Sequence, residues 1–463
     1  MSKSVLNVRV RTSTVRRSRP RFRGRLLFFI QYVTFQILKV NEAIMASKYY
    51  KKYIRIPLGE SIDIRPIMPI IEHPRFERLR HVSQLGTTIF IFPGASHNRF
   101  EHALGVYSKT LRFCNKMVQE GLLNKFEAKN VPLFGLLHDI GHGPFSHLIE
   151  ELTPYNHDKN GSKIIDEMKR EIKEAGGDPA FIKKLFVHKN PLCQIIMDKN
   201  LGMDKLDYLE RDVFHTGFGQ RPDLESVFNY LIYLKGGLVI DKKSLESAKQ
   251  IQRLYLYMYK EVHLHKSSLI AQRFLQKMIM IWLSKHKIDP LELWALNDQE
   301  IMAKLYTDSD ERLKFLYTAY IQRNLPMTGL VFRIDTKQSR ERLAGKKIKV
   351  IGESQKFFDQ VTKHSSPQAL EIIEKKIADL INVPAHTVIV VPTVSTRRFI
   401  PEDILYHDDG KILSLKKSQT EYFQGMSDEL NSYLSLRVSI IGDRDKIYNN
   451  AKKIHTLIKR EIY

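Results

Sequence analysis

The 463-residue chain has only two cysteines and no apolar run long enough to cross a membrane. Cys114 and Cys193 lie far apart, without the paired spacing of a disulfide framework or a zinc site, so we expect buried thiols in a cytoplasmic protein. The most apolar stretch near the N-terminus, residues 26–33, is too short for a span and contains Gln31. Internal repeats and low-complexity tracts are also lacking. These absences favour an ordinary globular protein with no membrane span.

The chain is strongly basic, with a formal net charge of +23. Residues 1–44 contain ten lysines and arginines against the single acid Glu42, a net +9, which leaves +14 for the rest. Because Met45 offers a second start, we expect residues 1–44 to be a basic extension that is disordered or misannotated. The alternative is an arm that binds a membrane surface or nucleic acid. The remaining surplus favours polyanionic ligands such as nucleotides, and weak nucleic-acid binding stays open.

The patterning predicts a mainly α protein with an appended α+β C-terminal lobe. Apolar residues recur at helical spacing over residues 66–290, and the pattern over 246–285 is long enough for two helices. Beyond residue 328, β-branched runs at 331–334, 387–391 and 436–441 alternate with helical segments at 366–380 and 446–460. Residues 404–413 read as a hairpin. We therefore expect a catalytic domain at 45–290, a helical connector at 291–327 and the lobe at 328–463.

The most informative segment is residues 136–147, where three histidines and an aspartate surround a Gly-Pro helix breaker. The chain has three His-Asp dipeptides, but only His138-Asp139 lies in an apolar run with further ligand-type residues nearby. Imidazole and carboxylate groups suit a catalytic divalent metal, and surplus histidines can transfer protons. Residues 97–105, 156–158 and 203–212 supply further candidate ligands. On a helix, the polar residues of 204–212 share one face, which predicts a polar pocket.

Several of these motifs resemble those of a known family. The runs at residues 76–80, 84–86, 92–102 and 138–147 resemble the HD-domain deoxynucleoside triphosphate triphosphohydrolases, in particular the branch of the SAM-and-HD-domain enzyme. The resemblance covers residues 50–285 strongly and the C-terminal lobe only loosely, and no SAM domain is visible. It implies a helical HD-domain core with a divalent metal, which would be Mn, Fe, Mg, Ni or Zn. The implied metal ligands are His102, His138, Asp139 and Asp204.

The resemblance also implies roles for a second group of acids and histidines. His147 matches the general acid that protonates the leaving 5′ oxygen, because an imidazole titrates near neutral pH. His142 and His157 match residues that line the α-phosphate pocket. Asp158 and Glu150 match acidic positions that orient these histidines. The alternative for His142 or His147 is a buried structural histidine after the Gly-Pro turn.

The same comparison implies seven substrate contacts, which are Arg99, Lys205, Tyr208, Asp212, Gln84, Leu85 and His263. Arg99 and Lys205 match phosphate-binding positions, where cations neutralise the triphosphate. Tyr208 matches a residue that excludes a 2′-hydroxyl, and Asp212 one that accepts a hydrogen bond from the 3′-hydroxyl. His263 stands where the family has a tyrosine beside the base.

The implied activity is hydrolysis of a dNTP to a deoxynucleoside and inorganic triphosphate, by attack of water on the α-phosphorus. Three alternatives stay open: a phosphohydrolase for another nucleotide, one acting on a single-stranded nucleic-acid end, and a nucleotide-sensing protein that binds nucleic acid. A homo-oligomer, dimer or tetramer, is expected from the resemblance. An activating nucleotide is left open, because Glu72 and Glu77 replace the aspartate and glutamine of the activated relative.

Overall fold

The structure is a computed structural model, and it describes residues 52–58, 61–334, 347–393 and 400–463. The chain divides into two compact units. The first comprises residues 1–53 and 63–65, so the prediction for residues 1–44 lies outside the described residues. The second comprises residues 54–62 and 66–463 and contains everything discussed below. Two short strands, β1 (Tyr53–Arg55) and β2 (Ser61–Asp63), precede the helices.

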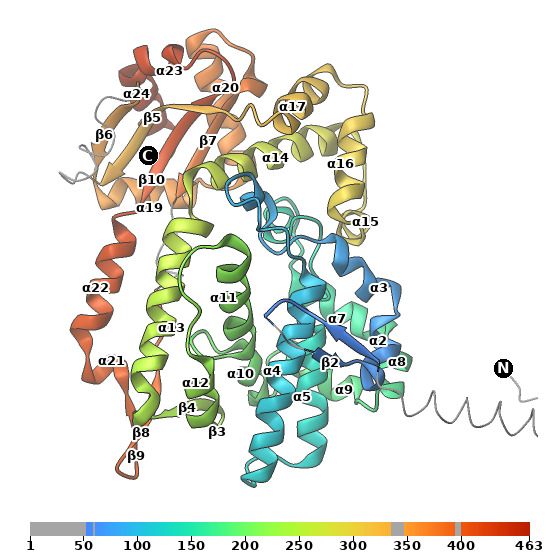
Figure 1. The fold of residues 1–463 in the computed structure, drawn as a ribbon. Helices are drawn as coiled ribbons and strands as arrows, with labels where there is room; N and C mark the ends of the chain where they lie inside the picture. Colours follow the sequence, from blue (N-terminus) through green and yellow to red (C-terminus); the bar gives the residue numbers. More distant parts are fainter. Residues whose placement is uncertain (1–51, 59–60, 335–346, 394–399) are drawn as a thin grey trace, which may run out of the picture. The chain divides into compact units, whose positions relative to one another are not determined.

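Helices dominate residues 66–285 (Figure 1). They are α2 (Met68–Ile71), α3 (Pro74–Glu77), α4 (Arg99–Gln119), α5 (Lys125–Leu137), α6 (His147–Glu150), α7 (His157–Glu167), α8 (Lys169–Glu174), α9 (Pro179–Phe186), α10 (Gln194–Met197), α11 (Met203–Thr216), α12 (Leu224–Tyr230), α13 (Leu245–Met258) and α14 (Lys266–Lys285). The two helices expected within 246–285 are α13 and α14, which a π-helical turn at Tyr259–His263 separates. Among the described helices, none combines the length and apolar character that a membrane crossing requires.

Local signals fix the three helices that carry the site. The Asn98 side chain caps α4 by accepting a hydrogen bond from the Glu101 amide. Asn124 and Glu127 form a capping box that starts α5. Helix α11 ends at Gly217, whose φ of 65° is the left-handed conformation that terminates helices. Helices α4 and α5 pack along one another, and α11 packs against α4.

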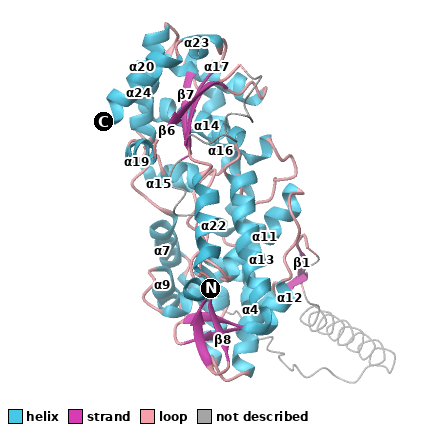
Figure 2. Cartoon of the chain, turned by 90° about the vertical axis from the view of Figure 1, so that its left-hand side faces the viewer, coloured by secondary structure: helices cyan, strands magenta, loops and turns pink. Residues whose placement is uncertain are grey.

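The connector and the C-terminal lobe follow. The connector contains α15 (Pro290–Ala295), α16 (Asp298–Thr307) and α17 (Glu311–Ile321). The lobe has a sheet of order β6-β5-β10-β7, made of β5 (Met327–Ile334), β6 (Lys349–Glu353), β7 (Val388–Thr393) and β10 (Ser435–Ile440). Its helices are α19 (Gln355–Lys363), α20 (Pro367–Ile381), α23 (Asp445–Asn449) and α24 (Ala451–Ile462). These elements confirm the mainly α fold with an α+β lobe (Figure 2).

The lobe's sheet has two apolar faces. Val388, Val390 and Val438 lie in one core with α19, α20 and α24. Ile389 and Val391 point to the other face, where they join a core that contains Phe274 and Met278 of α14. Alternation along a strand sends successive side chains to opposite faces, so β7 contributes to both cores. The lobe is therefore packed directly onto α14.

A second sheet joins distant parts of the chain. The hairpin β3 (Leu231–Leu234) and β4 (Gly237–Asp241) lies within the mostly helical region, and β4 pairs in parallel with β8 (Leu405–Asp408). Strand β8 forms the expected hairpin with β9 (Lys411–Ser414), and α21 (Leu415–Ser418) and α22 (Thr420–Asn431) follow. His407-Asp408 thus belongs to a hairpin, and Lys242 pairs with Asp408 at 2.7 Å. Residues 405–431 contact the helical region through the pairing of β8 with β4 and through the Tyr422 hydroxyl, which donates to the Lys249 carbonyl at 3.2 Å.

Candidate active site

Four predicted metal ligands converge from three helices. His102 comes from α4, His138 and Asp139 follow the last turn of α5, and Asp204 lies in the first turn of α11. Nε2 of His102 lies 3.1 Å from Oδ1 of Asp204 and 3.6 Å from Oδ2 of Asp139. Nε2 of His138 lies 3.3 Å from Oδ1 of Asp139 and 3.5 Å from Oδ1 of Asp204. His102, His138 and Asp204 each offer a ligand atom within 4.8 Å of the others, a mixed set that suits a divalent transition metal, and Asp139 adjoins both histidines.

The histidine orientations also fit a cation. Nδ1 of His138 donates a hydrogen bond to the Gly135 carbonyl at 2.8 Å, which leaves Nε2 facing the carboxylates. That Nε2 atom is buried and has no hydrogen-bond partner among the described residues. A buried polar atom without a partner is costly, and a bound cation would satisfy it. The residues present therefore fit a metal of the kind the HD motif implies.

A buried carboxylate that the sequence analysis did not single out supports His102 from behind. Asp207 is fully buried one turn after Asp204 and accepts a hydrogen bond from Nδ1 of His102 at 2.8 Å. Lys109 and Arg211 also donate to it, at 2.8 to 2.9 Å. Burial opposes its ionisation, but Arg211 and Lys109 hold the pKa of Asp207 well below its usual range. Asp207 therefore remains ionised and orients His102, as carboxylates behind metal-binding histidines do.

Gly105 makes room for this support. A Cβ atom at Gly105 would lie 2.1 Å from both Nη2 of Arg211 and Oδ1 of Asp207. The glycine in the middle of α4 thus permits α11 to place the Asp207–Arg211 pair behind the ligand. The spacing of Asp207 from Asp204 was the available sequence signal, but periodicity alone does not distinguish a ligand from its support.

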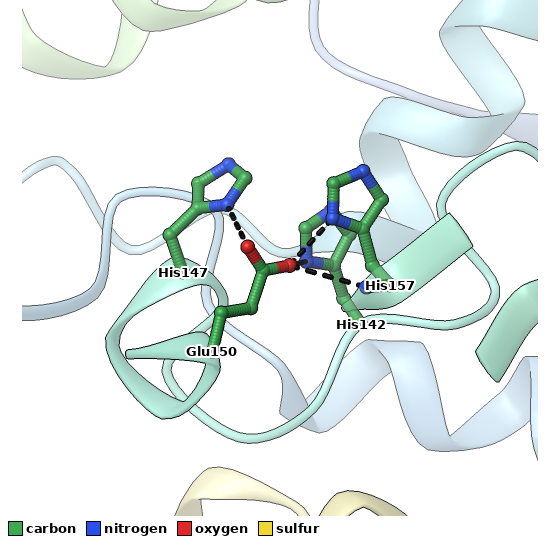
Figure 3. A group of neighbouring side chains, drawn as sticks. All are labelled: His142, His147, Glu150 and His157. Atoms are coloured by element: carbon green, nitrogen blue, oxygen red, sulfur yellow. Dashed lines mark hydrogen bonds and ion pairs between the residues drawn. The ribbon is translucent and has the colours of Figure 1, made fainter. Parts of the chain in front are cut away.

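The predicted catalytic histidines gather around Glu150 (Figure 3). Its carboxylate accepts hydrogen bonds from Nδ1 of His157 at 2.5 Å and from Nδ1 of His147 at 3.2 Å. His142 and His157 stack with ring centroids 4.1 Å apart. Nε2 of His142 lies 3.2 Å from Oδ1 of Asp139, so this group adjoins the metal ligands. The structure therefore brings the two sets of predicted residues together.

Electrostatics give the members of this cluster different roles. Burial opposes ionisation of Glu150, but hydrogen bonds from His147 and His157 hold its pKa below its usual range. Burial, together with the nearby Arg99 and His157, keeps the pKa of His142 well below its ordinary value, so this imidazole is neutral. Burial lowers the pKa of His157, but the Glu150 carboxylate overcomes this and raises it. The fifth predicted member, Asp158, is more exposed than His157, and its Oδ1 atom lies 3.5 Å from Nε2 of His157.

A strained turn presents His147. Phe145 and Ser146, which precede it, both have positive φ values, 54° and 56°, a conformation that non-glycine residues rarely adopt. The Phe145 amide donates to Asp298 at 2.6 Å, and the Ser146 hydroxyl donates to the Ser83 carbonyl at 2.8 Å. These bonds hold a costly turn at a candidate catalytic residue. The His147 side chain is left 66% exposed, available to a ligand.

The two predicted phosphate-binding cations lie differently. Arg99 is buried and donates to Asp139 and, at 2.7 Å, to the Ser146 hydroxyl, so it belongs to the ligand cluster. Lys205 donates to the Lys199 carbonyl and lies over the Tyr255 ring, 3.5 Å from its centroid. Burial lowers its pKa to about 8. Among the described residues, the Lys205 amine makes no hydrogen bond or ion pair with Asp139 or Arg99, so its phosphate role stays a prediction.

The predicted sugar contact Asp212 lies between two histidines. Oδ1 of Asp212 lies 2.8 Å from Nε2 of His97, and Oδ2 lies 3.3 Å from Nε2 of His263. Burial opposes ionisation, but the His263 and His97 imidazoles lower the pKa of Asp212 to about 2. The Oδ2 and His263 Nε2 atoms are buried and make no hydrogen bond to a described residue. The sequence analysis did not predict His97 as a site residue and named it only within a longer run. Tyr208 lies one turn before Asp212 on the same helix and is half-buried.

Five predicted residues line one cavity of about 590 Å³. They are Gln84, Leu85, His147, Glu150 and His263. The cavity volume falls in the range of small-molecule sites. Two predicted catalytic residues and three predicted substrate-binding residues therefore share one hollow, and the other seven predicted residues are not among its lining.

Several known proteins are similar in sequence to this chain. The HD domain model matches residues 99–213, which include all four candidate ligands. An uncharacterised protein of Methanocaldococcus jannaschii is 28% identical, over 56% of this chain and 55% of that protein. The deoxynucleoside triphosphate triphosphohydrolase SAMHD1 of Homo sapiens is 30% identical, over 46% of this chain and 41% of that protein. The chain spans about half the length of these relatives.

The fold has solved counterparts. The crystal structure of a phosphohydrolase from Bacteroides thetaiotaomicron superposes with a TM-score of 0.66 at 22% identity, covering 85% of this chain and all of that one. This likeness extends the shared fold beyond the HD motif. The motif, its converging ligands and the relatives agree. Residues 99–213 therefore form an HD domain, and this part of the chain is similar to that of the HD-domain deoxynucleoside triphosphate triphosphohydrolases.

Proposed function

We propose that this protein is a metal-dependent dNTP triphosphohydrolase, which cleaves a dNTP to a deoxynucleoside and inorganic triphosphate. The observation that carries the proposal is the junction of two groups: the ligand set around His102 and His138, and the His147–Glu150 pair at the cavity. His142 links them through its contact with Asp139. Relatives named as deoxynucleoside triphosphate triphosphohydrolases, including those of Homo sapiens and Bos taurus, support the substrate class.

The proposed metal-binding residues are His102, His138, Asp139 and Asp204. These residues would hold a divalent metal, which would supply Lewis-acid chemistry for polarising the α-phosphoryl group and lowering the pKa of water. Arg99, held beside Asp139, contributes positive charge where the triphosphate gathers negative charge.

His147 is the proposed general acid. Glu150 accepts its Nδ1 hydrogen at 3.2 Å, which leaves Nε2 as the proton-transferring atom. Glu150, whose carboxylate stays ionised, thereby orients the imidazole ring. The proton passes from Nε2 to the departing 5′ oxygen. Neutral His142 and the more basic His157 line the α-phosphate side.

Tyr208 and Asp212 are the proposed sugar selectors. The half-buried tyrosine ring excludes a 2′-hydroxyl, and burial with nearby Tyr259 and Tyr255 raises the pKa of its phenol, so the ring stays neutral. Oδ2 of Asp212 has no hydrogen-bond partner among described residues, so it can accept one from a 3′-hydroxyl. Cytoplasmic location, homo-oligomerisation, nucleotide activation and weak nucleic-acid binding stay predictions from the sequence.

The test uses metal-depleted protein restored separately with Mn²⁺ or Mg²⁺ and incubated with each dNTP and the matching rNTP. We expect inorganic triphosphate and a deoxynucleoside in equal amounts, and slower turnover of rNTPs. The matched pair of variants is Asp204→Asn, which removes a ligand charge, and Asp166→Asn, which removes the charge of an exposed acid of α7 outside the predicted site. Release of orthophosphate, or full activity in the Asp204 variant, contradicts the proposal.

A further inference from the structure

The cavity extends beyond the residues used in the proposed reaction. Besides His147 and Glu150, it is lined by Gln272 and Arg273 of α14 and by the C-terminal lobe. The lobe contributes Ser365, which lies between α19 and α20, and the end of β7 up to Thr393. A substrate whose leaving group lies at His147 therefore shares its cavity with this wall of α14 and the lobe.

A buried ion cluster fixes the wall in place. Glu374 of α20 is fully buried and accepts hydrogen bonds from Lys277 at 2.9 Å and from Arg273 at 3.2 Å, both on α14. Its other oxygen accepts from the Val390 amide of β7 at 2.9 Å. One carboxylate thus ties α20, β7 and α14 together beside the cavity. The wall therefore has a fixed arrangement, because separating these elements would leave buried charges unpaired.

The polar side chains of α14 at the wall differ in whether they already have hydrogen-bond partners. Nε2 of Gln276 donates to Glu151 at 2.8 Å, and Arg273 donates to Glu374 and to the Pro367 carbonyl. Gln272 is half-buried, lines the cavity and makes no hydrogen bond to any residue in the described ranges. Its amide is the α14 group at this wall that is available to a ligand.

The wall suits a neutral planar group better than a phosphate. Glu374 compensates the charge of Arg273, so no uncompensated cation of α14 faces the cavity there. Leu370 and Pro392 add apolar surface beside Gln272. Apolar surface with a few convergent polar groups is typical of sites for drug-sized ligands. A glutamine amide both donates and accepts, so it can pair with the edge of any nucleobase.

We propose that α14 and the C-terminal lobe form the nucleobase subsite of this cavity, with the Gln272 amide meeting the edge of the base. The inference rests on the proposed dNTP activity and deepens it, because it gives the lobe a direct part in substrate binding. Tolerance of several bases follows from the two-way hydrogen bonding of one amide.

The test measures KM and kcat for the four dNTPs and for 2-deoxyribose 5-triphosphate, which lacks a base. Gln272→Leu removes the amide, and Gln368→Leu makes the same change at an exposed position of α20. Ser365→Trp fills the cavity from a half-buried loop, and Thr362→Trp is its exposed control on α19. We expect Gln272→Leu to raise KM for dNTPs about fivefold, the scale of one lost hydrogen bond, with kcat nearly unchanged. Ser365→Trp should raise KM further.

The base-free substrate separates base binding from a general defect. We expect both cavity variants to process it as the controls do. Equal damage to base-free and base-containing substrates, or variants that match their controls on every dNTP, would overturn the inference while the proposed function stands. If the wild-type protein turns over no dNTP, the proposed function fails, and the subsite falls with it.

Discussion

Replacing Asp207 by asparagine removes one charge and nearly preserves the shape of the side chain. In the structure, this carboxylate receives hydrogen bonds from His102, Lys109 and Arg211, all within 2.9 Å. It is fully buried, so it is out of contact with bulk solvent. The variant tests whether the support behind a ligand is as necessary as the ligand itself.

Two magnitudes follow. Removing one partner of a buried ion pair costs about 3–5 kcal/mol, because the remaining cations stay buried without compensation. Losing a carboxylate behind a metal-binding histidine weakens metal affinity by about 10–100-fold. Since each factor of ten equals about 1.4 kcal/mol, the loss at the metal is about 1.4–2.8 kcal/mol. Asp207→Asn should therefore lower both the free energy of unfolding and metal affinity.

The assay combines denaturant unfolding of the metal-free protein with Mn²⁺ titration by calorimetry. Glu210→Gln is the matched control, because Glu210 lies 3.3 Å from the same Lys109 amine but has no contact with His102. Both variants should lose stability, whereas only Asp207→Asn should weaken metal binding. Unchanged Mn²⁺ affinity in Asp207→Asn would refute the assigned role, and an equal loss of affinity in both variants would show a general defect.

Three further perturbations test the same structure. Gly105→Ala should cost about 2 kcal/mol of unfolding free energy and weaken Mn²⁺ binding, because the new methyl group displaces Arg211 and Asp207; wild-type stability by denaturant unfolding would contradict this. Asp212→Asn should cost about 2 kcal/mol at pH 7, since the folded pKa of about 2 lies below the usual 3.9; this stabilisation is present above about pH 4 and lost as the pH falls toward 2, so a pH-independent difference between wild type and variant would contradict it. Glu374→Gln should lower the free energy of unfolding by about 3–5 kcal/mol and increase amide hydrogen exchange in β7. Unchanged exchange there would contradict the role of Glu374 in holding α20, β7 and α14 together.

The sequence predicted site residues where ligand-type side chains interrupt a pattern of helical spacing. His138 and Asp139 stand out because a charged pair interrupts an apolar helix, and the family motif linked them to His102 and Asp204. The helical region, its two helices within 246–285 and the β8–β9 hairpin followed from periodicity and a turn signal. Each of these signals is local, so a single sequence reveals it.

The remaining features depend on contacts between distant residues. Asp207 reads as one more acid on an amphipathic helix until α4 places Lys109 and His102 against it. The positive φ of Phe145 has no residue signature, because Asp298 in the connector holds that turn. The pairing of β4 with β8 joins residues more than 160 positions apart, so no local pattern could predict it. The contribution of the lobe to the cavity wall likewise depends on contacts between distant residues.

Product analysis tests the central claim most directly. The Mn²⁺-restored protein is incubated with a dNTP, and the phosphorus-containing products are identified by ³¹P NMR together with chromatography of the nucleoside. The account predicts inorganic triphosphate and free deoxynucleoside in equal amounts, with loss of both when a chelator removes the metal. Orthophosphate with dNDP, pyrophosphate with dNMP, or no product at all would contradict it.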